Sequence, residues 1–209
     1  MALTGGGCVW TCGNNDYGQL GHGDRTHKHL LTRVDPGHFG GANIVMAACG
    51  DHHSVVAAAG DVFTWGRGSF GHLGHNDEQD RLAPARLGRE QFGGGKIVFL
   101  SSALSLSEGG VLWVWGFGGY GQLGLGDRDD RMVPTRLGAG EVFTSFLSLV
   151  RMAACGGLHT LVATEEGVVW AFGKGEHGHW ASTTRMTGWC RRRGGCRARP
   201  RRGERARCV

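Results

Sequence analysis

Three glycine-rich stretches have the spacing of a nucleotide-binding loop. The pattern G-x-G-x-x-G begins at Gly66, at Gly116 and at Gly173, each time directly after an apolar, strand-like run. In dinucleotide-binding proteins this pattern opens a helix whose N-terminus faces a phosphate. Here the second copy continues as QLGLGDRDDR, in which two further glycines disfavour a helix. We therefore predict no cofactor, and we assign tight backbone turns to these glycines, chiefly Gly66, Gly71, Gly116 and Gly121.

Two Cys-x-x-x-His pairs have the residue types of a zinc site. Cys49 precedes His53, and Cys155 precedes His159. Zinc needs three or four protein ligands that converge on one point, whereas these pairs lie about a hundred residues apart. Two alanines precede each cysteine, which favours a small thiol in a packed core. The sequence therefore predicts no metal site, but a core cysteine and a loop histidine hydrogen-bonded to the backbone.

Hydroxyl and carboxyl groups also stand where catalysis could use them. Ser54 follows His53 and Thr160 follows His159, but neighbours on a strand point to opposite faces and cannot form a nucleophile–base pair. Acidic residues cluster at 77–80 and 127–130. They could bind a cation, but the sequence favours a solvated loop. We predict no catalytic residue and no enzymatic bond chemistry.

These candidate sites belong to a repeat that organises the chain. The segments VWTCGNNDYGQLGHGD (9–24), FTWGRGSFGHLGHND (63–77) and WVWGFGGYGQLGLGD (113–127) are copies of one pattern, and VWAFGKGEHGHW (169–180) begins as a fourth. The glycine that ends the aromatic strand recurs at spacings of 53, 50 and 57 residues. Each period contains about four short strand-like runs separated by turns, which is typical of a β-propeller blade.

The order of these elements carries a resemblance to a known family. Cys-Gly-x-x-His, an apolar strand, a glycine turn, V-x-x-W-G and G-Q-L-G-x-G-D follow one another, which resembles the repeat of the regulator of chromosome condensation family. That resemblance implies an all-β fold: an incomplete β-propeller of about three to four blades, each of four short antiparallel strands. The expected parts are a partial propeller over 1–178, with repeats at about 7–58, 59–108, 109–163 and 164–178, and an Arg-rich tail over 179–209.

The same resemblance suggests what the chain does. The leading hypothesis is a non-enzymatic scaffold that displays variable loops to a protein partner, because every repeated residue has a structural explanation. The alternative is guanine-nucleotide exchange on a small, Ran-like GTPase. The positions that the resemblance implies for a partner-facing loop are Asp51, His53 and His159. Open blade edges also favour self-association.

The net charge of +5 combines two unlike parts of the chain. Residues 185–209 contain ten arginines and one glutamate, whereas the remainder is mildly acidic. The tail could bind nucleic-acid phosphates, or it could come from a shifted reading frame; the body itself is not expected to bind nucleic acid. The N-terminus lacks the pattern of a signal peptide, and no apolar run approaches the length of a membrane span. We expect a cytoplasmic or nuclear protein without membrane contact.

Overall fold

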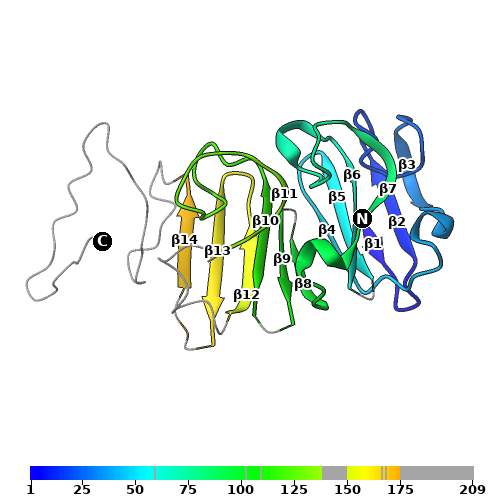
Figure 1. Ribbon diagram of the computed structural model, residues 1–209. Helices are drawn as coiled ribbons and strands as arrows, with labels where there is room; N and C mark the ends of the chain where they lie inside the picture. Colours follow the sequence, from blue (N-terminus) through cyan, green and yellow to red (C-terminus); the bar gives the residue numbers. More distant parts are fainter. Residues whose placement is uncertain are drawn as a thin grey trace, which may run out of the picture.

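Four antiparallel β-sheets follow one another along the chain and form an open arc (Figure 1). The structure, a computed structural model, describes residues 1–58, 60–101, 103–108, 110–137, 150–165, 167 and 169–174. The predicted all-β, incomplete propeller is confirmed, since the described residues form sheets of three or four strands and the arc does not close. The predicted Arg-rich tail, 179–209, lies outside the described residues.

Each sheet is built from strands that are consecutive in the sequence. The first sheet contains β1 (Ala2–Leu3), β2 (Val9–Gly13) and β3 (Lys28–Arg33). The second contains β4 (Met46–Cys49), β5 (His53–Ala58), β6 (Asp61–Gly66) and β7 (Arg81–Leu87). The third contains β8 (Ile97–Ser101), β9 (Leu104–Ser107), β10 (Leu112–Gly116) and β11 (Arg131–Arg136). The fourth contains β12 (Val150–Cys155), β13 (His159–Thr164) and β14 (Val169–Gly173).

Three short 3-10 helices complete the described elements. They are η1 (Pro36–Phe39), η2 (Ser69–Gly71) and η3 (Arg89–Phe92). The first strands of successive sheets, β4, β8 and β12, lie next to one another on the inner side of the arc. A sheet joins the end of one sequence repeat to the start of the next, since the second sheet begins within 7–58 and ends within 59–108.

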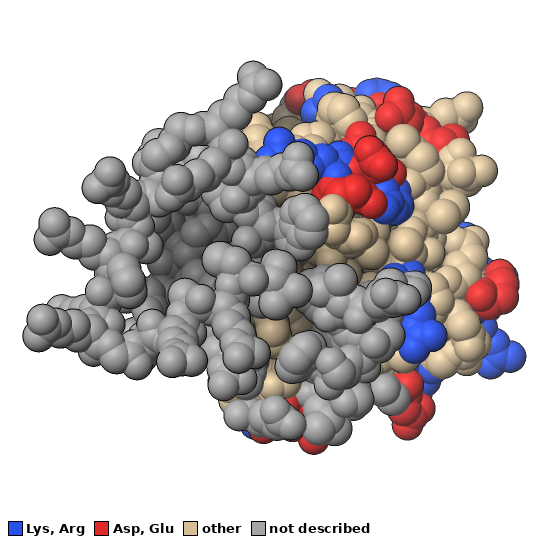
Figure 2. All heavy atoms as spheres, turned by 60° about the vertical axis from the view of Figure 1, so that its left-hand side comes forward, with Lys and Arg blue, Asp and Glu red and all other residues tan. Residues whose placement is uncertain are grey.

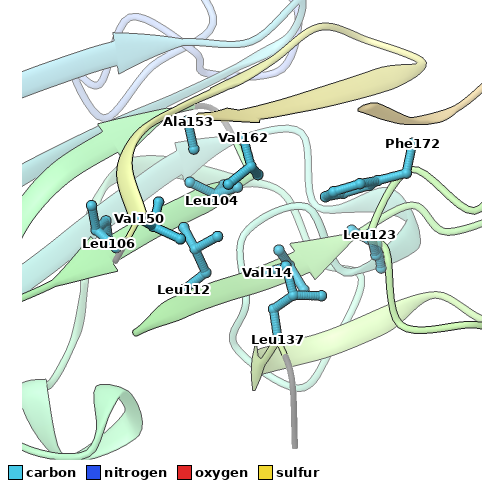
Figure 3. Close-up of a cluster of buried hydrophobic side chains, with 10 residues drawn as sticks. All are labelled: Leu104, Leu106, Leu112, Val114, Leu123, Leu137, Val150, Ala153, Val162 and Phe172. Carbon is cyan, nitrogen blue, oxygen red and sulfur yellow. The ribbon is translucent and has the colours of Figure 1, made fainter. Parts of the chain in front are cut away.

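The cores lie between successive sheets, where apolar side chains of both meet. Val9 and Val34 of the first repeat pack against Val56 and Trp65 of the second sheet. Figure 3 shows the corresponding cluster between the third and fourth sheets. Its members are Leu104, Leu106, Leu112, Val114, Leu123, Leu137, Val150, Ala153, Val162 and Phe172. Because a strand alternates its side chains, an inner sheet must be apolar on both faces.

A buried tryptophan joins each inner sheet to the loop before it. The Trp65 indole N–H donates to the Gln19 carbonyl at 2.9 Å, and the Trp115 indole N–H donates to the His72 carbonyl at 3.0 Å. Trp65 lies so close to Gly21 that a Cβ there would be 2.7 Å from the indole nitrogen. The backbone of Gly21 also has φ +78°. Glycine at this position of the repeat therefore serves both the turn and the close packing of the next sheet.

Candidate interaction face

A cavity of about 440 Å³ lies where the second, third and fourth sheets meet. Its walls come from strands of these three sheets and from the loops next to them. The lining residues are Cys49, Gly50, Asp51, His52, His53, Arg67, Phe70, His72, Ala103, Val114, Phe117, Gln122, Leu123, Cys155, Gly156, Gly157 and Thr160. The two Cys-Gly-x-x-His segments thus contribute to one hollow, although they are far apart in the sequence.

Two of the three predicted partner-facing residues lie in this cavity. Asp51 is exposed, and its carboxylate lies 3.6 Å from where a Cβ of Gly157 would be, so the loops of the second and fourth sheets approach each other. His53 begins β5 and is only 8% exposed. His159 begins β13 at the equivalent position, is half-buried and does not line the cavity.

The glycine of the Cys-Gly-x-x-His segment makes room for the histidine ring. A Cβ on Gly50 would lie 2.3 Å from Cε1 of His53, and a Cβ on Gly156 would lie 2.9 Å from Cε1 of His159. Both contacts are shorter than packing allows, so a larger residue would displace the ring. In each segment the histidine ring therefore lies against the glycine three residues before it. This contact is a structural reason for the repeated Gly-x-x-His spacing.

Two titratable side chains in the wall of the cavity, His72 and Cys155, are neutral. The His53 and His72 rings stack with centroids 5.3 Å apart. Burial, followed by the charges of His53 and Arg67, lowers the pKa of His72 to about 4, so this ring is neutral at pH 7. Burial raises the pKa of the Cys155 thiol, which keeps it protonated. A protonated thiol is a poor nucleophile and a poor metal ligand.

The cysteine prediction is wrong for one of its two residues. Cys155 is half-buried, with its backbone N–H donating to the Ser101 hydroxyl at 3.1 Å. Cys49 is exposed in the wall of the cavity. Within the part of the chain that the structure describes, no cluster of three or more His, Cys, Asp or Glu side chains could hold a metal ion.

The hydroxyl groups next to the histidines connect neighbouring sheets. Ser54 donates to the Gln19 carbonyl at 2.8 Å, and Thr160 donates to the Gln122 carbonyl at 2.8 Å. In both cases the acceptor lies in the loop of the preceding sheet. These hydroxyls are therefore committed to inter-sheet hydrogen bonds rather than aimed at an adjacent base.

The acidic loops have a more specific role than the solvated loop that the sequence favoured. Asp80 accepts the Gly68 N–H at 3.1 Å, and Asp130 accepts the Gly118 N–H at 2.7 Å. Asp77 forms a paired hydrogen bond with the Arg81 guanidinium, which, as the largest cause, lowers the pKa of Asp77 to about 2. The carboxylates hold the ends of the loop together, because their acceptor oxygens bind its own N–H groups and the first residue of the following strand.

The predicted turn glycines have backbone angles that favour glycine. Their φ values are +104° for Gly66, +71° for Gly71, +92° for Gly116 and +73° for Gly121. At Gly66 a Cβ would also lie 2.5 Å from the His52 carbonyl oxygen. The hydrogen-bond register of β6 and β7 shifts between Thr64 and Gly66, and β10 and β11 show the same shift between Val114 and Gly116.

A row of aromatic side chains on this face was missed by sequence reasoning. Tyr17, Phe70 and Tyr120 occupy one position of the repeat, four residues after the strand-ending glycine. Each contacts the residue that follows that glycine in the next repeat. The three pairs are Arg67 over Tyr17 (5.0 Å), Phe70 with Phe117 (5.1 Å) and Lys174 over Tyr120 (5.0 Å).

The aromatic row, defined by these six residues, is partly open to solvent. Phe70 is 42% exposed and Tyr120 is 40% exposed. Arg67, Phe70 and Phe117 also line the cavity, so the row forms its rim. The signal in the sequence was the recurrence of an aromatic residue at one position, but its contact partner lies about 50 residues further on.

Charge on the rest of the surface is mixed. Figure 2 shows acidic and basic side chains side by side, with uncharged surface between them, on the described part of the face in view. Ion pairs such as Arg86 with Asp61 and Arg25 with Asp80 account for part of this mixture. None of the helices among the described residues is long and apolar enough to cross a membrane.

Known proteins share both the sequence pattern and the fold. The Regulator of chromosome condensation (RCC1) repeat model matches residues 6–57, 59–101 and 109–163. The probable E3 ubiquitin-protein ligase HERC4 of Rattus norvegicus is 35% identical over 184 residues, covering 85% of this chain and 17% of HERC4. The ultraviolet-B receptor UVR8 of Arabidopsis thaliana is 34% identical over 182 residues, covering 85% of this chain and 39% of UVR8.

A solved structure supports the fold assignment. Prp20p from Saccharomyces cerevisiae superposes with a TM-score of 0.68 at 22% identity, covering 84% of this chain and 43% of Prp20p. The chain spans less than half of the length of each of these three proteins. With three repeats matched and four successive antiparallel sheets, this chain belongs to the regulator of chromosome condensation (RCC1) repeat family.

Proposed function

We propose that this chain is a non-enzymatic interaction module that binds a protein partner through the aromatic row and the adjoining cavity. The observation that carries the proposal is the row itself, in which Phe70 and Tyr120 remain partly exposed and the Lys174 ammonium group lies over the Tyr120 ring. Aromatic residues and arginine are enriched in protein interfaces and among the residues that contribute most to binding.

The repeat uses its other loop residues to hold its own structure, whereas the aromatic side chains of the row are not needed for those contacts. The carboxylates bind loop N–H groups, the hydroxyls bind the neighbouring loop, and the tryptophans fill the space between sheets. The aromatic side chains of Phe70 and Tyr120 make none of these hydrogen bonds, although the Phe70 backbone N–H donates to the Glu78 carboxylate at 3.1 Å. Asp51 and His53 are proposed to join the same interface from within the cavity, and His159 from its edge.

The test compares the proteins captured by the chain and by two variants. Phe70→Ala with Tyr120→Ala removes the exposed part of the row, whereas Val133→Ala removes an equally exposed apolar side chain on β11. After chemical cross-linking, quantitative mass spectrometry should find proteins that the double variant loses about tenfold and that Val133→Ala retains, as expected for a loss of about 1.4 kcal/mol. Equal recovery with all three chains would contradict the proposal.

Guanine-nucleotide exchange on a Ran-like GTPase is the second candidate. The solved structure of Prp20p is described together with its binding to Gsp1p and histones, and the Cys-Gly-x-x-His loops of this chain surround the cavity. Exchange needs no bond chemistry, since a factor that binds the nucleotide-free GTPase more tightly accelerates nucleotide release. Release of a fluorescent GDP from Ran should then accelerate with the wild-type chain and not with Asp51→Ala; an unchanged rate with the wild type would exclude this function.

We propose a cytoplasmic or nuclear location, with nucleic-acid binding only through residues 179–209. Binding to duplex DNA that disappears, with its salt dependence, when residues 179–209 are removed would support this assignment. Binding that survives the removal would place the contact on the body of the chain and contradict it.

A further inference from the structure

The open side of the fourth sheet exposes residues that are core residues elsewhere in this chain. Leu161 in β13 is 40% exposed, whereas the equivalent Val55 in β5 and Leu104 in β9 are fully buried. Met152 in β12 is 58% exposed, whereas the equivalent Met46 in β4 packs against the cluster between the second and third sheets. We call Leu161 and Met152 the trailing flank.

The chain itself shows what covers such a flank. Val55 is covered by Ile97, Leu100 and Trp115 of the third sheet. Leu104 is covered by Val150, Ala153 and Val162 of the fourth sheet. In both cases the cover is the next sheet along the chain. The cover that fits the trailing flank is therefore another sheet of this family, packed in the same orientation.

The first sheet also has an open side, on the face where the second and third sheets each pack against the sheet before them. Cys12 in β2 stands where Trp65 and Trp115 stand, yet it is exposed while both tryptophans are fully buried. Leu31 in β3 is 54% exposed, whereas Pro134, at the same position of β11, is buried. We call Cys12 and Leu31, together with the half-buried Trp10 two residues before Cys12 in β2, the leading flank.

The two flanks lie at opposite ends of the arc, and the described residues of one chain do not bring them together (Figure 1). We propose that two copies of this chain pair head to tail, so that the trailing flank of each packs on the leading flank of the other. A two-fold axis makes the two contacts identical and closes the assembly. The size agrees with a ring, since one chain spans 43% of the propeller chain of Prp20p.

The proposal does not depend on a partner at the aromatic row, because the flanks and that face use different residues. Pairing covers the apolar side chains that an isolated arc leaves in water, and it protects the end sheets from indiscriminate association. A head-to-tail contact that did not close would instead extend into fibres.

Three variants of the full chain test the pairing. Leu161→Asp alters the trailing flank, Leu31→Asp alters the leading flank, and Val133→Asp is the control, since Val133 is 42% exposed and belongs to neither flank. Sedimentation velocity should give the wild type and Val133→Asp about twice the 22.3 kDa of one chain. Each flank variant should weaken pairing at least about tenfold, because a charge placed against an apolar surface loses its hydration.

Mixing the two flank variants separates a lost contact from a lost fold. Leu161→Asp retains an intact leading flank and Leu31→Asp retains an intact trailing flank, so one of the two contacts can form between them. Differently tagged variants should therefore co-purify with each other and not with copies of themselves. A monomeric wild type, a fibre instead of a closed pair, an equal effect of Val133→Asp, or no rescue on mixing would each overturn the proposal.

Discussion

The same strand of the repeat meets different surroundings in the second and fourth sheets. β5 reads HSVVAA and all six of its residues are buried, whereas β13 reads HTLVAT and only Thr160, Val162 and Thr164 are buried. Both are the second strand of their sheet, and both pair with strands on either side. The difference comes from the packing between sheets, because neighbouring sheets cover both faces of β5 and only one face of β13.

This comparison teaches that the repeat does not contain its own core. Each sheet contributes half of a cluster and depends on the next sheet for the other half. A residue is therefore a core residue or a surface residue according to its place in the arc, although its position in the repeat is the same.

The largest expected effect compares one substitution at two equivalent positions. Leu104→Ala, in the cluster between the third and fourth sheets, should lower the free energy of unfolding by about 3 kcal/mol, because it removes a fully buried side chain. Leu161→Ala should cost about 1 kcal/mol or less at low protein concentration, because Leu161 is already 40% exposed. Urea unfolding measures both values. Equal costs at low concentration would mean that the fourth sheet is covered in the single chain.

The second prediction is that removing a hydroxyl group destabilises the fourth sheet more than the second sheet. In the second sheet, the Gln19 carbonyl accepts from both Ser54 and Trp65. In the fourth sheet, Phe172 stands where Trp65 stands, so among the described residues only Thr160 donates to the Gln122 carbonyl. Thr160→Ala should therefore cost about 2 kcal/mol and Ser54→Ala about 1 kcal/mol in urea unfolding. A larger cost for Ser54→Ala would show that the two donors of the second sheet act together.

The third prediction concerns acid sensitivity near the second sheet. Burial is the main cause that lowers the pKa of both His72 and His75 to about 4, whereas an unfolded histidine takes up a proton near pH 6.5. Stability therefore falls as the pH falls from about 6.5 towards 4, by under about 1 kcal/mol per histidine between pH 7 and 6. Hydrogen exchange should show β5 and β6 losing protection before β13.

A matched variant tests the origin of that acid sensitivity. In the third repeat, Val114 and Leu125 stand where the second repeat has Thr64 and His75, whose hydroxyl and ring nitrogen lie 3.0 Å apart. Thr64→Val with His75→Leu copies the apolar pair and should reduce the dependence of stability on pH. An unchanged dependence would assign the effect to His72 alone.

The smallest expected effect is on the aromatic row. Phe70→Ala should change the free energy of unfolding by no more than about 0.5 kcal/mol, because the side chain is 42% exposed and lies outside the inter-sheet clusters. The same substitution should weaken partner binding. A cost above about 2 kcal/mol would mean that Phe70 belongs to the core of the loop face.

The fold was predictable because its strongest signals are local and repeated. The aromatic strand, its terminal glycine and the following turn recur in register, and the strands at Val9–Gly13, Asp61–Gly66 and Leu112–Gly116 follow that pattern. The aromatic row was not predictable in the same way, because each contact joins one repeat to the next. The exposure of Cys49 was not predictable either, because Cys155 follows the same two alanines and is half-buried.

The tryptophan contacts have a consequence for how the arc unfolds under a pulling force. Trp65 and Trp115 each join a sheet to the loop before it through one indole hydrogen bond, so each sheet is held to its neighbour by a separate contact. Under a pulling force applied at the two ends, we expect the sheets to unfold one after another, from the outer sheets inward. Each step should lengthen the molecule by about 50 residues of extended chain. In single-molecule stretching, the force–extension curve should then show several evenly spaced force peaks. One abrupt rupture would instead show that the sheets bear the load as a unit.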